Sequence, residues 1–356
     1  MEYIDWSKSN QSGSLMRQLT FVSQGHVEWR EAPEPKIQSA LAATVRPLAI
    51  GRCDLDTGYV RGLAPIASGE PIGHEMIGEV VEVGDAVDRF RPGDRVIVSA
   101  QISCGHCRMC SRGFTGRCEN VPFGASYGMG REGGFGSLAC DLALVPFADA
   151  MLVSLPQGAD PGAMIGVADM ALDAWRAVGP QLTARPGARV LVMGGAAQVI
   201  GLYAAGIVVA CGAGEAVYAD DDPARRAQAA RFGAKICRPE ELSGAFEIIV
   251  EASGDAALMV KALDLAEPEA LVTAVSIHFG AATPMPLQMM YWRGMQFATG
   301  RPNCRAQMEP LLARCSSAPG VADHFHPAVI EQTVYDFDDA PQAWMDPALR
   351  IVAARA

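Results

Sequence analysis

Residues 73–87 read GHEMIGEVVEVGDAV, a short apolar run interrupted by glycines, and they fit the pattern G-H-E-x2-G-x5-G-x2-V. A second short run, RPGDRVIV, follows at residues 91–98. Apolar runs of this length, broken by glycine and proline, are typical of short strands joined by tight turns. We therefore predict a compact, mostly antiparallel, barrel-like domain before residue 160.

The second part of the chain has a different pattern, because predicted strands and helices alternate after residue 160. This alternation favours a doubly wound α/β domain with a parallel sheet and right-handed crossovers. The expected strands are RVLVM (189–193), AVYAD (216–220), EIIVEAS (247–253) and EALVTAVS (269–276), and the expected helices are PARRAQAARFGA (223–234) and DAALMVKALDLA (255–266).

Bulk composition excludes several classes of protein. The chain has 356 residues, 50% of them hydrophobic, and a formal net charge of -11. Because phosphate binding needs clustered Lys and Arg, the acidic balance disfavours a nucleic-acid partner. The N-terminus carries no export signal, so we expect a cytoplasmic protein with reduced thiols. The charge-free run at 190–214 is long enough to cross a bilayer, but its glycines split it into a strand, a turn and a helix, so we expect no membrane span.

Four cysteines lie within residues 104–118 in the spacing C-x2-C-x2-C-x7-C. A short loop of this form can wrap four thiolates around one zinc ion, and such a closed site is structural. An iron–sulfur cluster is the weaker alternative, since its usual motif has a shorter last gap followed by proline. His106 lies between two of the ligands and is expected to face solvent. The predicted structural zinc ligands are Cys104, Cys107, Cys110 and Cys118.

Together with this thiol lobe, Cys53 in GRCDLDTGYVRG and His74 in the GHE motif carry a family resemblance. From about Met16 to the C-terminus the chain resembles the zinc-dependent medium-chain dehydrogenases, the alcohol dehydrogenase superfamily. The resemblance implies a GroES-like catalytic domain and a Rossmann domain that binds NAD. The implied bounds are 16–172 and 301–356 for the catalytic domain, 173–300 for the coenzyme domain and 1–15 for an N-terminal extension.

The same resemblance implies roles for residues around a catalytic zinc ion, in addition to the structural one. Cys53 and His74 would bind this metal. Asp169 would be the third ligand, with Asp173 one helical turn later as the alternative. Asp56 would hold the far nitrogen of His74, and Glu75 would lie beside the metal. Each chain would therefore bind two zinc ions.

A coenzyme site is suggested by VLVMGGAAQVIGLYAAG, which reads as a strand, a glycine turn and a helix. The turn departs from G-x-G-x-x-G, because seven steps separate its outer glycines and alanine replaces the middle one. Asp220 ends the next strand, where an acid accepts hydrogen bonds from the adenosine ribose and repels a 2'-phosphate. Asp221 and Asp222 add to that repulsion or cap the next helix, and we predict NAD rather than NADP. The candidate coenzyme residues are Gly194, Gly195, Ala196, Val199, Ile200, Gly201 and Asp220.

One departure from the family concerns proton release. Many relatives have a hydroxyl residue two positions after the catalytic cysteine and a histidine three positions further on, but this chain has Leu55 and Gly58. Neither side chain can relay a proton. The proton would leave through water, the Thr57 hydroxyl, the coenzyme ribose or a carboxylate such as Asp54, and the sequence leaves the route open.

We predict an oxidoreductase that transfers hydride between NAD(H) and a small alcohol or its aldehyde or ketone. A same-fold lyase or isomerase with tightly bound NAD, and a non-catalytic dinucleotide-binding regulator, remain alternatives. The segment YWRGMQFATGRP at 291–302 resembles the closing strand of the family's coenzyme domain, so we expect a homodimer or homotetramer. Substrate identity stays open, and the candidate pocket residues are Tyr59, Trp175, Met289 and Tyr291.

Overall fold

The computed structural model describes residues 13–129, 135–280, 282–316 and 324–355. The chain forms two compact units: the first comprises Met1–Asp169, Asn303–Leu312 and Glu331–Ala356, and the second comprises Met170–Pro302 and Ala313–Ile330.

This division differs from the predicted one at 313–330, which had been expected in the catalytic domain and instead belongs to the second unit. This segment packs on the second unit: Phe325 lies edge-on against Tyr203 of α6 (Gln198–Ala210), with ring centroids 5.7 Å apart. Most of the predicted N-terminal extension, residues 1–12, lies outside the described residues. Its last residue, Leu15, begins the first strand.

The first unit contains a two-stranded and a seven-stranded sheet among its described residues. The larger sheet has the order β14-β15-β3-β4-β5-β7, and β6 pairs with β3. All its pairs are antiparallel except β14 with β15, so the predicted mostly antiparallel domain is confirmed. The strands are β1 Leu15–Ser23, β2 His26–Pro33, β3 Ala43–Gly51, β4 Glu75–Val83, β5 Arg95–Val98, β6 Ala143–Val145, β7 Leu152–Ser154, β14 Gln332–Asp336 and β15 Arg350–Ala354.

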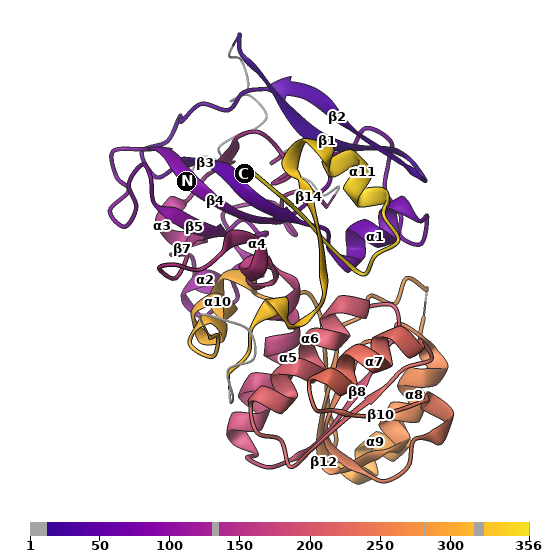
Figure 1. Ribbon diagram of the computed structural model, residues 1–356. Coiled ribbons are helices and arrows are strands. Elements are labelled where there is room, and N and C mark those ends of the chain that lie inside the picture. The colour runs from indigo at the N-terminus through magenta and orange to yellow at the C-terminus, as the bar shows by residue number, and fades with distance from the viewer. Residues whose placement is uncertain (1–12, 130–134, 281, 317–323, 356) are drawn as a thin grey trace. The chain divides into compact units, whose positions relative to one another are not determined.

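Short helices connect these strands (Figure 1). The α-helices are α1 Asp54–Val60, α2 Arg108–Ser111, α3 Ala148–Met151, α4 Pro161–Met164, α10 Cys304–Leu312 and α11 Ala340–Met345. The 3-10 helices are η2 Thr115–Arg117, η3 Ile165–Ala168 and η6 Phe337–Asp339.

The glycines of the GHE pattern are required by packing around β4. Gly73 has a φ of +96°, and a Cβ there would lie 2.6 Å from the Ala139 side chain. A Cβ at Gly78 would lie 2.5 Å from the carbonyl oxygen of Arg46. Real Cβ atoms do not approach other atoms this closely, so the motif fixes the position of β4. His74, which directly precedes β4, is fixed with it.

The second unit has a parallel sheet of order β10-β9-β8-β11-β12-β13, which confirms the predicted Rossmann-type fold. Strand β8 coincides with the predicted 189–193. In Figure 1 helices α6 to α8 lie beside this sheet, and they contact its strands. The strands are β8 Arg189–Met193, β9 Glu215–Ala219, β10 Lys235–Cys237, β11 Phe246–Glu251, β12 Ala266–Ala274 and β13 Gln296–Thr299. The helices are α5 Met170–Ala184, α6 Gln198–Ala210, α7 Pro223–Arg231, α8 Ala256–Asp264 and α9 Leu287–Arg293, with 3-10 helices η4 Pro239–Glu241 and η5 Pro327–Val329.

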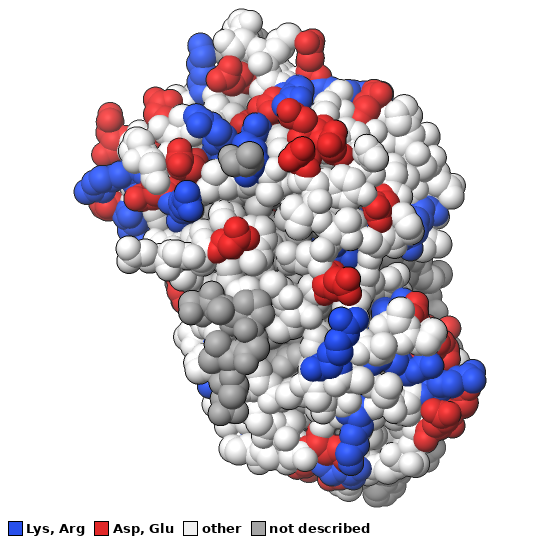
Figure 2. Space-filling view, viewed as in Figure 1, with Lys and Arg blue, Asp and Glu red and all other residues white. Residues whose placement is uncertain are grey.

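Figure 2 shows acidic and basic side chains intermixed on one face of the molecule. This distribution agrees with the ordinary, acidic composition of the chain. Across the residues that the structure describes, no helix is long and apolar enough to span a membrane.

Candidate metal centres and coenzyme site

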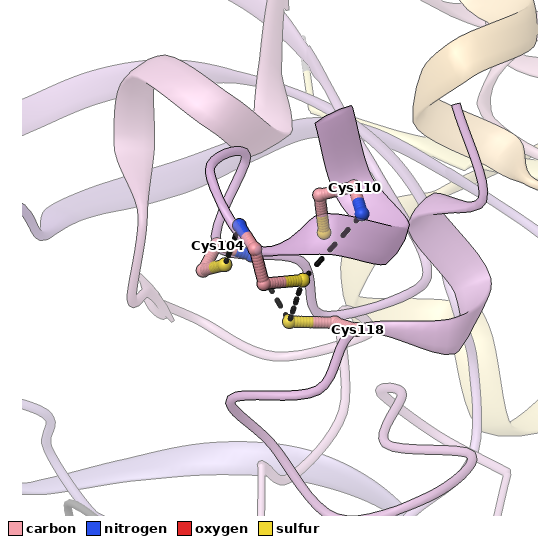
Figure 3. Close-up of side chains that lie close together, drawn as sticks. Cys104, Cys110 and Cys118 are labelled. Carbon is pink, nitrogen blue, oxygen red and sulfur yellow. Dashed lines mark hydrogen bonds between the residues drawn. The ribbon is translucent and has the colours of Figure 1, made fainter. Parts of the chain in front are cut away.

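The thiol lobe brings its four cysteines together as the spacing predicts. The sulfur atoms of Cys104, Cys107, Cys110 and Cys118 all lie within 4.8 Å of one another. Figure 3 shows the sulfurs of Cys104, Cys110 and Cys118 close together. The sulfurs of Cys107 and Cys118 are 4.0 Å apart. No disulfide bond joins any of the ten cysteines, all of which are described. Four convergent sulfurs on a short loop are the donor set of a structural zinc site.

Backbone N–H groups support negative charge on these sulfurs. Cys107 Sγ accepts hydrogen bonds from the N–H groups of Cys110 and Glu119, both at 3.4 Å. Burial raises the pKa of Cys107, but these hydrogen bonds outweigh it and lower the pKa to about 6. His106 stays outside the sulfur group, as expected, and its Nδ1 lies 2.9 Å from the carbonyl oxygen of Cys104.

A second cluster joins three residues that are distant in sequence. Cys53 is the N-cap residue of α1, His74 precedes β4, and Asp169 follows η3. The Oδ2 atom of Asp169 lies 3.3 Å from Cys53 Sγ and 3.3 Å from His74 Nε2. All three residues are buried, and their potential ligand atoms lie within 4.8 Å of one another. Thiolate, imidazole and carboxylate together are a donor set that zinc accepts.

Charge balance around this cluster also favours a bound cation. Asp56 and Glu75 are fully buried beside it, so the centre collects several acidic groups. Burial raises the pKa of Cys53, and the charges of Asp169 and Glu75 raise it further. Burial lowers the pKa of His74, but Asp56 and Asp169 more than offset this and raise it to about 9. A divalent cation would compensate these negative charges and stabilise the thiolate.

Asp56 lies beside both the Cys53 turn and His74, whose far nitrogen it was predicted to hold. Its Oδ2 accepts a hydrogen bond from the Cys53 N–H at 3.1 Å. Its Oδ1 lies 3.7 Å from His74 Nδ1, which is longer than a hydrogen bond. Asp56 therefore fixes the start of α1, and its predicted hold on His74 stays a prediction.

Arg350 was missed in the sequence. Its Nη1 lies 2.7 Å from Glu75 Oε2, and both residues are completely buried. The same Nη1 donates to the carbonyl oxygen of Arg52 at 3.0 Å, directly before Cys53. Arg350 thus joins the Cys53 turn to the His74 segment. Arg350 begins the otherwise apolar strand sequence RIVAA, and an arginine at such a position indicates a buried partner of opposite charge.

The alternative third ligand, Asp173, does not belong to this cluster. It lies within α5, where its carboxylate accepts a hydrogen bond from Arg176. The described structure therefore favours Asp169.

The positions named for proton release have other contacts. The Thr57 hydroxyl donates to the Cys53 carbonyl oxygen at 3.3 Å. Leu55 packs against the apolar core of the first unit. A Cβ at Gly58 would lie 3.1 Å from the Ala64 side chain, so a histidine would be crowded there. These contacts do not select a route for the proton, so water, Thr57, the coenzyme ribose and Asp54 all stay open as predictions.

In the second unit the glycine turn lies between β8 and α6. The Ala196 N–H donates to the Ser253 carbonyl oxygen at 2.9 Å. Gly195 has a φ of +154°, and a Cβ there would lie 2.6 Å from the Ser253 backbone. This turn thus packs directly on the loop after β11, which explains why small residues are required. Val199 and Ile200 are buried in the first turn of α6, followed there by Gly201.

Asp220 follows β9 and is almost fully buried. Its carboxylate accepts a hydrogen bond from the Tyr218 hydroxyl at 2.7 Å. Arg225 donates two further hydrogen bonds to it, both at 2.7 Å. Asp222 caps α7, which is one of the two roles that the sequence analysis proposed for the acids after Asp220. The arginine was not anticipated, and it offsets the charge on which the prediction of NAD over NADP depended.

The four candidate pocket residues have different environments. The Tyr59 hydroxyl donates to the Met129 carbonyl oxygen at 3.3 Å. Trp175 is buried, and Met289 packs against the core of the second unit. Tyr291 lies exposed on α9. Trp175 and Met289 are therefore accounted for by packing.

Comparison with known proteins supports the same interpretation. Residues 40–156 match the family described as the alcohol dehydrogenase GroES-like domain. A glutathione-independent formaldehyde dehydrogenase from Pseudomonas aeruginosa is 32% identical over 234 residues, which cover 62% of this chain and 58% of that protein. The NADP-dependent isopropanol dehydrogenase of Thermoanaerobacter brockii is 29% identical over 317 residues, covering 83% of this chain and 87% of that protein.

Solved structures extend the similarity to the whole fold. The alcohol dehydrogenase TADH from Thermus sp. ATN1 has a TM-score of 0.85 and 26% identity, over 96% of this chain and 100% of that chain. A GroES-like domain, a parallel α/β domain and two convergent ligand clusters define the class of zinc-type dehydrogenases. The chain thus contains a segment that matches the alcohol dehydrogenase GroES-like domain, and it is similar in sequence and fold to zinc-type alcohol dehydrogenases. The matched segment spans little more than half the length of the formaldehyde dehydrogenase.

Proposed function

We propose that the protein is a zinc-dependent oxidoreductase that transfers hydride between NAD(H) and a small alcohol or its aldehyde or ketone. The observation that carries this proposal is the convergence of Cys53, His74 and Asp169 at one buried point. Three protein ligands leave a fourth position for substrate oxygen, as catalytic zinc sites require.

The residues of the chain would divide the work around this centre. Cys53, His74 and Asp169 would hold the zinc, which supplies Lewis acidity to a substrate oxygen when it is bound. Asp56 fixes the Cys53 turn through the 3.1 Å hydrogen bond to its N–H. The Glu75–Arg350 pair holds the two ligand-bearing segments together. We propose that the lobe cysteines bind a second zinc ion, which gives two per chain.

We propose NAD as the coenzyme. The glycine turn lies at the carboxyl end of β8, where parallel sheets bind dinucleotides, and Asp220 lies at the end of the neighbouring strand. The relative from Thermoanaerobacter brockii is named for NADP dependence, so the choice needs a direct test.

The function is tested by adding NAD and a panel of primary and secondary alcohols to zinc-loaded protein. Appearance of NADH absorbance is the expected result, and the matched control is His74→Ala, which removes one proposed ligand. Turnover of a substrate without net NADH formation would favour the lyase or isomerase alternative. Bound NADH, seen by fluorescence, with no turnover of any substrate would favour the regulator.

We also propose a homodimer or homotetramer that assembles through β13, the terminal strand of the parallel sheet among the described residues. Tyr291 and Trp292 on the preceding α9 are 79% and 77% exposed. Exposed aromatic side chains beside an open strand edge are typical of an association surface. Sedimentation should give a dimer or a dimer of dimers. Trp292→Glu should weaken association, whereas Phe123→Glu, at an equally exposed aromatic in the first unit, should not.

A further inference from the structure

The two oxygens of Asp169 have different partners. Oδ2 faces Cys53 and His74 in the ligand cluster. Oδ1 lies 3.6 Å from the sulfur of Cys304, the first residue of α10, which is completely buried. A thiol is a weak donor, and this sulfur–oxygen distance fits an S–H to carboxylate hydrogen bond. The geometry therefore places one donor on Oδ1, while Oδ2 contacts Cys53 and His74.

Two hydrogen bonds hold the chain at the start of α10, where Cys304 lies. The Cys304 N–H donates to Gln101 Oε1 at 3.2 Å, and Gln101 is itself buried. Asn303 Oδ1 accepts a hydrogen bond from the Gly116 N–H in η2 at 3.1 Å. The start of α10 is thus anchored on both sides. The thiol is held against Asp169 by the surrounding structure rather than by the thiol contact alone.

A carboxylate can bind a metal through one oxygen or through both. Binding through both would use a coordination position that a catalytic zinc site keeps for substrate. A hydrogen-bond donor on the second oxygen opposes this, since partners of the ligands set their orientation and basicity. We propose that Cys304 is a positioning residue, whose S–H holds Oδ1 so that Asp169 presents only Oδ2 to the metal. This inference rests on the proposed catalytic zinc site.

Direct ligation by Cys304 is the competing interpretation. Apart from the thiol lobe, the described group of ligand atoms that lie within 4.8 Å of one another comes from Cys53, His74 and Asp169, and Cys304 is not in it. The two interpretations differ in the number of thiolates on the metal. Cobalt(II) distinguishes them, because its ligand-field bands report coordination number and its sulfur charge-transfer band reports thiolate ligands.

The experiment uses the full chain with cobalt(II) exchanged into the catalytic site. The variants are Cys304→Ala, which removes the donor, and Cys304→Ser, which keeps a hydroxyl donor. Cys140→Ala is the matched control, because Cys140 is equally buried in the core of the first unit. The spectrum of Asp169→Ala, which retains the lobe site alone, is subtracted from each. Zinc affinity is measured by chelator competition, and melting temperature monitors folding.

We expect Cys304→Ala to bind catalytic zinc about tenfold more weakly, and its cobalt bands to shift toward higher coordination with the charge-transfer band intact. Cys304→Ser should recover part of the affinity, and Cys140→Ala should match the unmodified protein. Unchanged bands and affinity in Cys304→Ala, or equal changes in Cys140→Ala, would overturn the inference. So would a Cys304→Ser variant that recovers nothing, or a halved charge-transfer band in Cys304→Ala. If the unmodified protein binds metal only in the lobe, the proposed function itself fails.

Discussion

The thiol lobe and the proposed catalytic cluster, which consists of Cys53, His74 and Asp169, are built in opposite ways. The lobe takes all four sulfurs from residues 104–118, so local spacing alone brings them together. The catalytic cluster takes Cys53, His74 and Asp169 from three separate segments, and Cys53 and Asp169 are 116 positions apart. The first depends on a short loop and the second on the whole fold of the unit. A change elsewhere in the unit should therefore disturb the catalytic cluster more than the lobe.

Their surroundings differ as well. Backbone N–H groups support the lobe sulfurs, as at Cys107. The catalytic cluster is surrounded by buried charges, including Asp56 and the Glu75–Arg350 pair. Charges supplied by distant segments can be removed one at a time by mutation, whereas backbone donors cannot.

The largest effect is expected from loss of a catalytic ligand. Cys53→Ser should lower kcat/KM with alcohols by at least about a thousandfold, because metal activation of substrate oxygen contributes several kcal/mol. Steady-state kinetics at saturating NAD measures this. The lobe should keep its metal in the same protein, and a simultaneous loss of both metals would show that the two clusters are not independent.

Loss of a lobe ligand should act on stability instead. Cys110→Ser should lower the free energy of unfolding by about 4 kcal/mol, since a structural zinc site contributes binding energy directly to folding. Denaturant unfolding monitored by circular dichroism measures the change. The remaining folded molecules should keep their catalytic metal. Full stability with an empty lobe would contradict a structural role.

Breaking the link between the two catalytic segments should have a smaller effect. Arg350→Met leaves Glu75 buried without its cation and should cost about 3 kcal/mol of unfolding free energy. Catalytic zinc should bind more weakly, while lobe zinc is unaffected. Arg95→Met, at an exposed position of β5 in the same sheet, is the control. Equal effects of the two substitutions would mean that the buried pair has no special role.

Coenzyme choice should respond to the Asp220–Arg225 pair. Asp220→Gly should reduce the preference for NAD over NADP by about tenfold, because it removes a charge that repels a 2'-phosphate. Arg225→Gln should increase the preference, since it frees the charge of Asp220. Binding of NADH and NADPH by fluorescence measures both. Equal efficiency with NAD and NADP in the unmodified protein would contradict the assignment.

The smallest effect is expected at an ion network remote from either cluster. Burial raises the pKa of Asp141, but hydrogen bonds from Arg17 and Arg355 outweigh it and lower the pKa. A lowered carboxyl pKa stabilises the fold above the unfolded value of about 3.9, and this stability is lost as pH falls through the folded value. Asp141→Asn should therefore cost roughly 1 kcal/mol near neutrality and less at low pH, with both metals retained. A deficit that grows in acid would contradict this.

The sequence predicted the features that depend on local spacing and missed those that depend on tertiary contacts. The lobe ligands and β8 were predictable, because spacing and a β-branched run are local signals. Asp169 was named only through the family resemblance. Arg350 and Cys304 were missed, because each meets its partner through tertiary contacts that no neighbouring residue encodes.

The second unit shows the same limit. The strand before Asp220 was predicted. The partner of Asp220, Arg225, was not predicted, although it lies five positions later. The sequence shows the acid and the arginine, yet only the turn into α7 brings them together. The sequence also did not predict that residues 313–330 belong to the second unit. Their placement involves a tertiary contact, the packing of Phe325 against Tyr203.

The most direct test of the account is the metal content of the purified protein, measured by atomic emission together with Asp169→Ala and Cys110→Ser. We predict two zinc ions per chain in the unmodified protein and one in each variant. The remaining ion should lie in the lobe for Asp169→Ala. For Cys110→Ser it should be held by Cys53, His74 and Asp169. A single ion in the unmodified protein, unaffected by Asp169→Ala, would contradict a catalytic metal held by Cys53, His74 and Asp169.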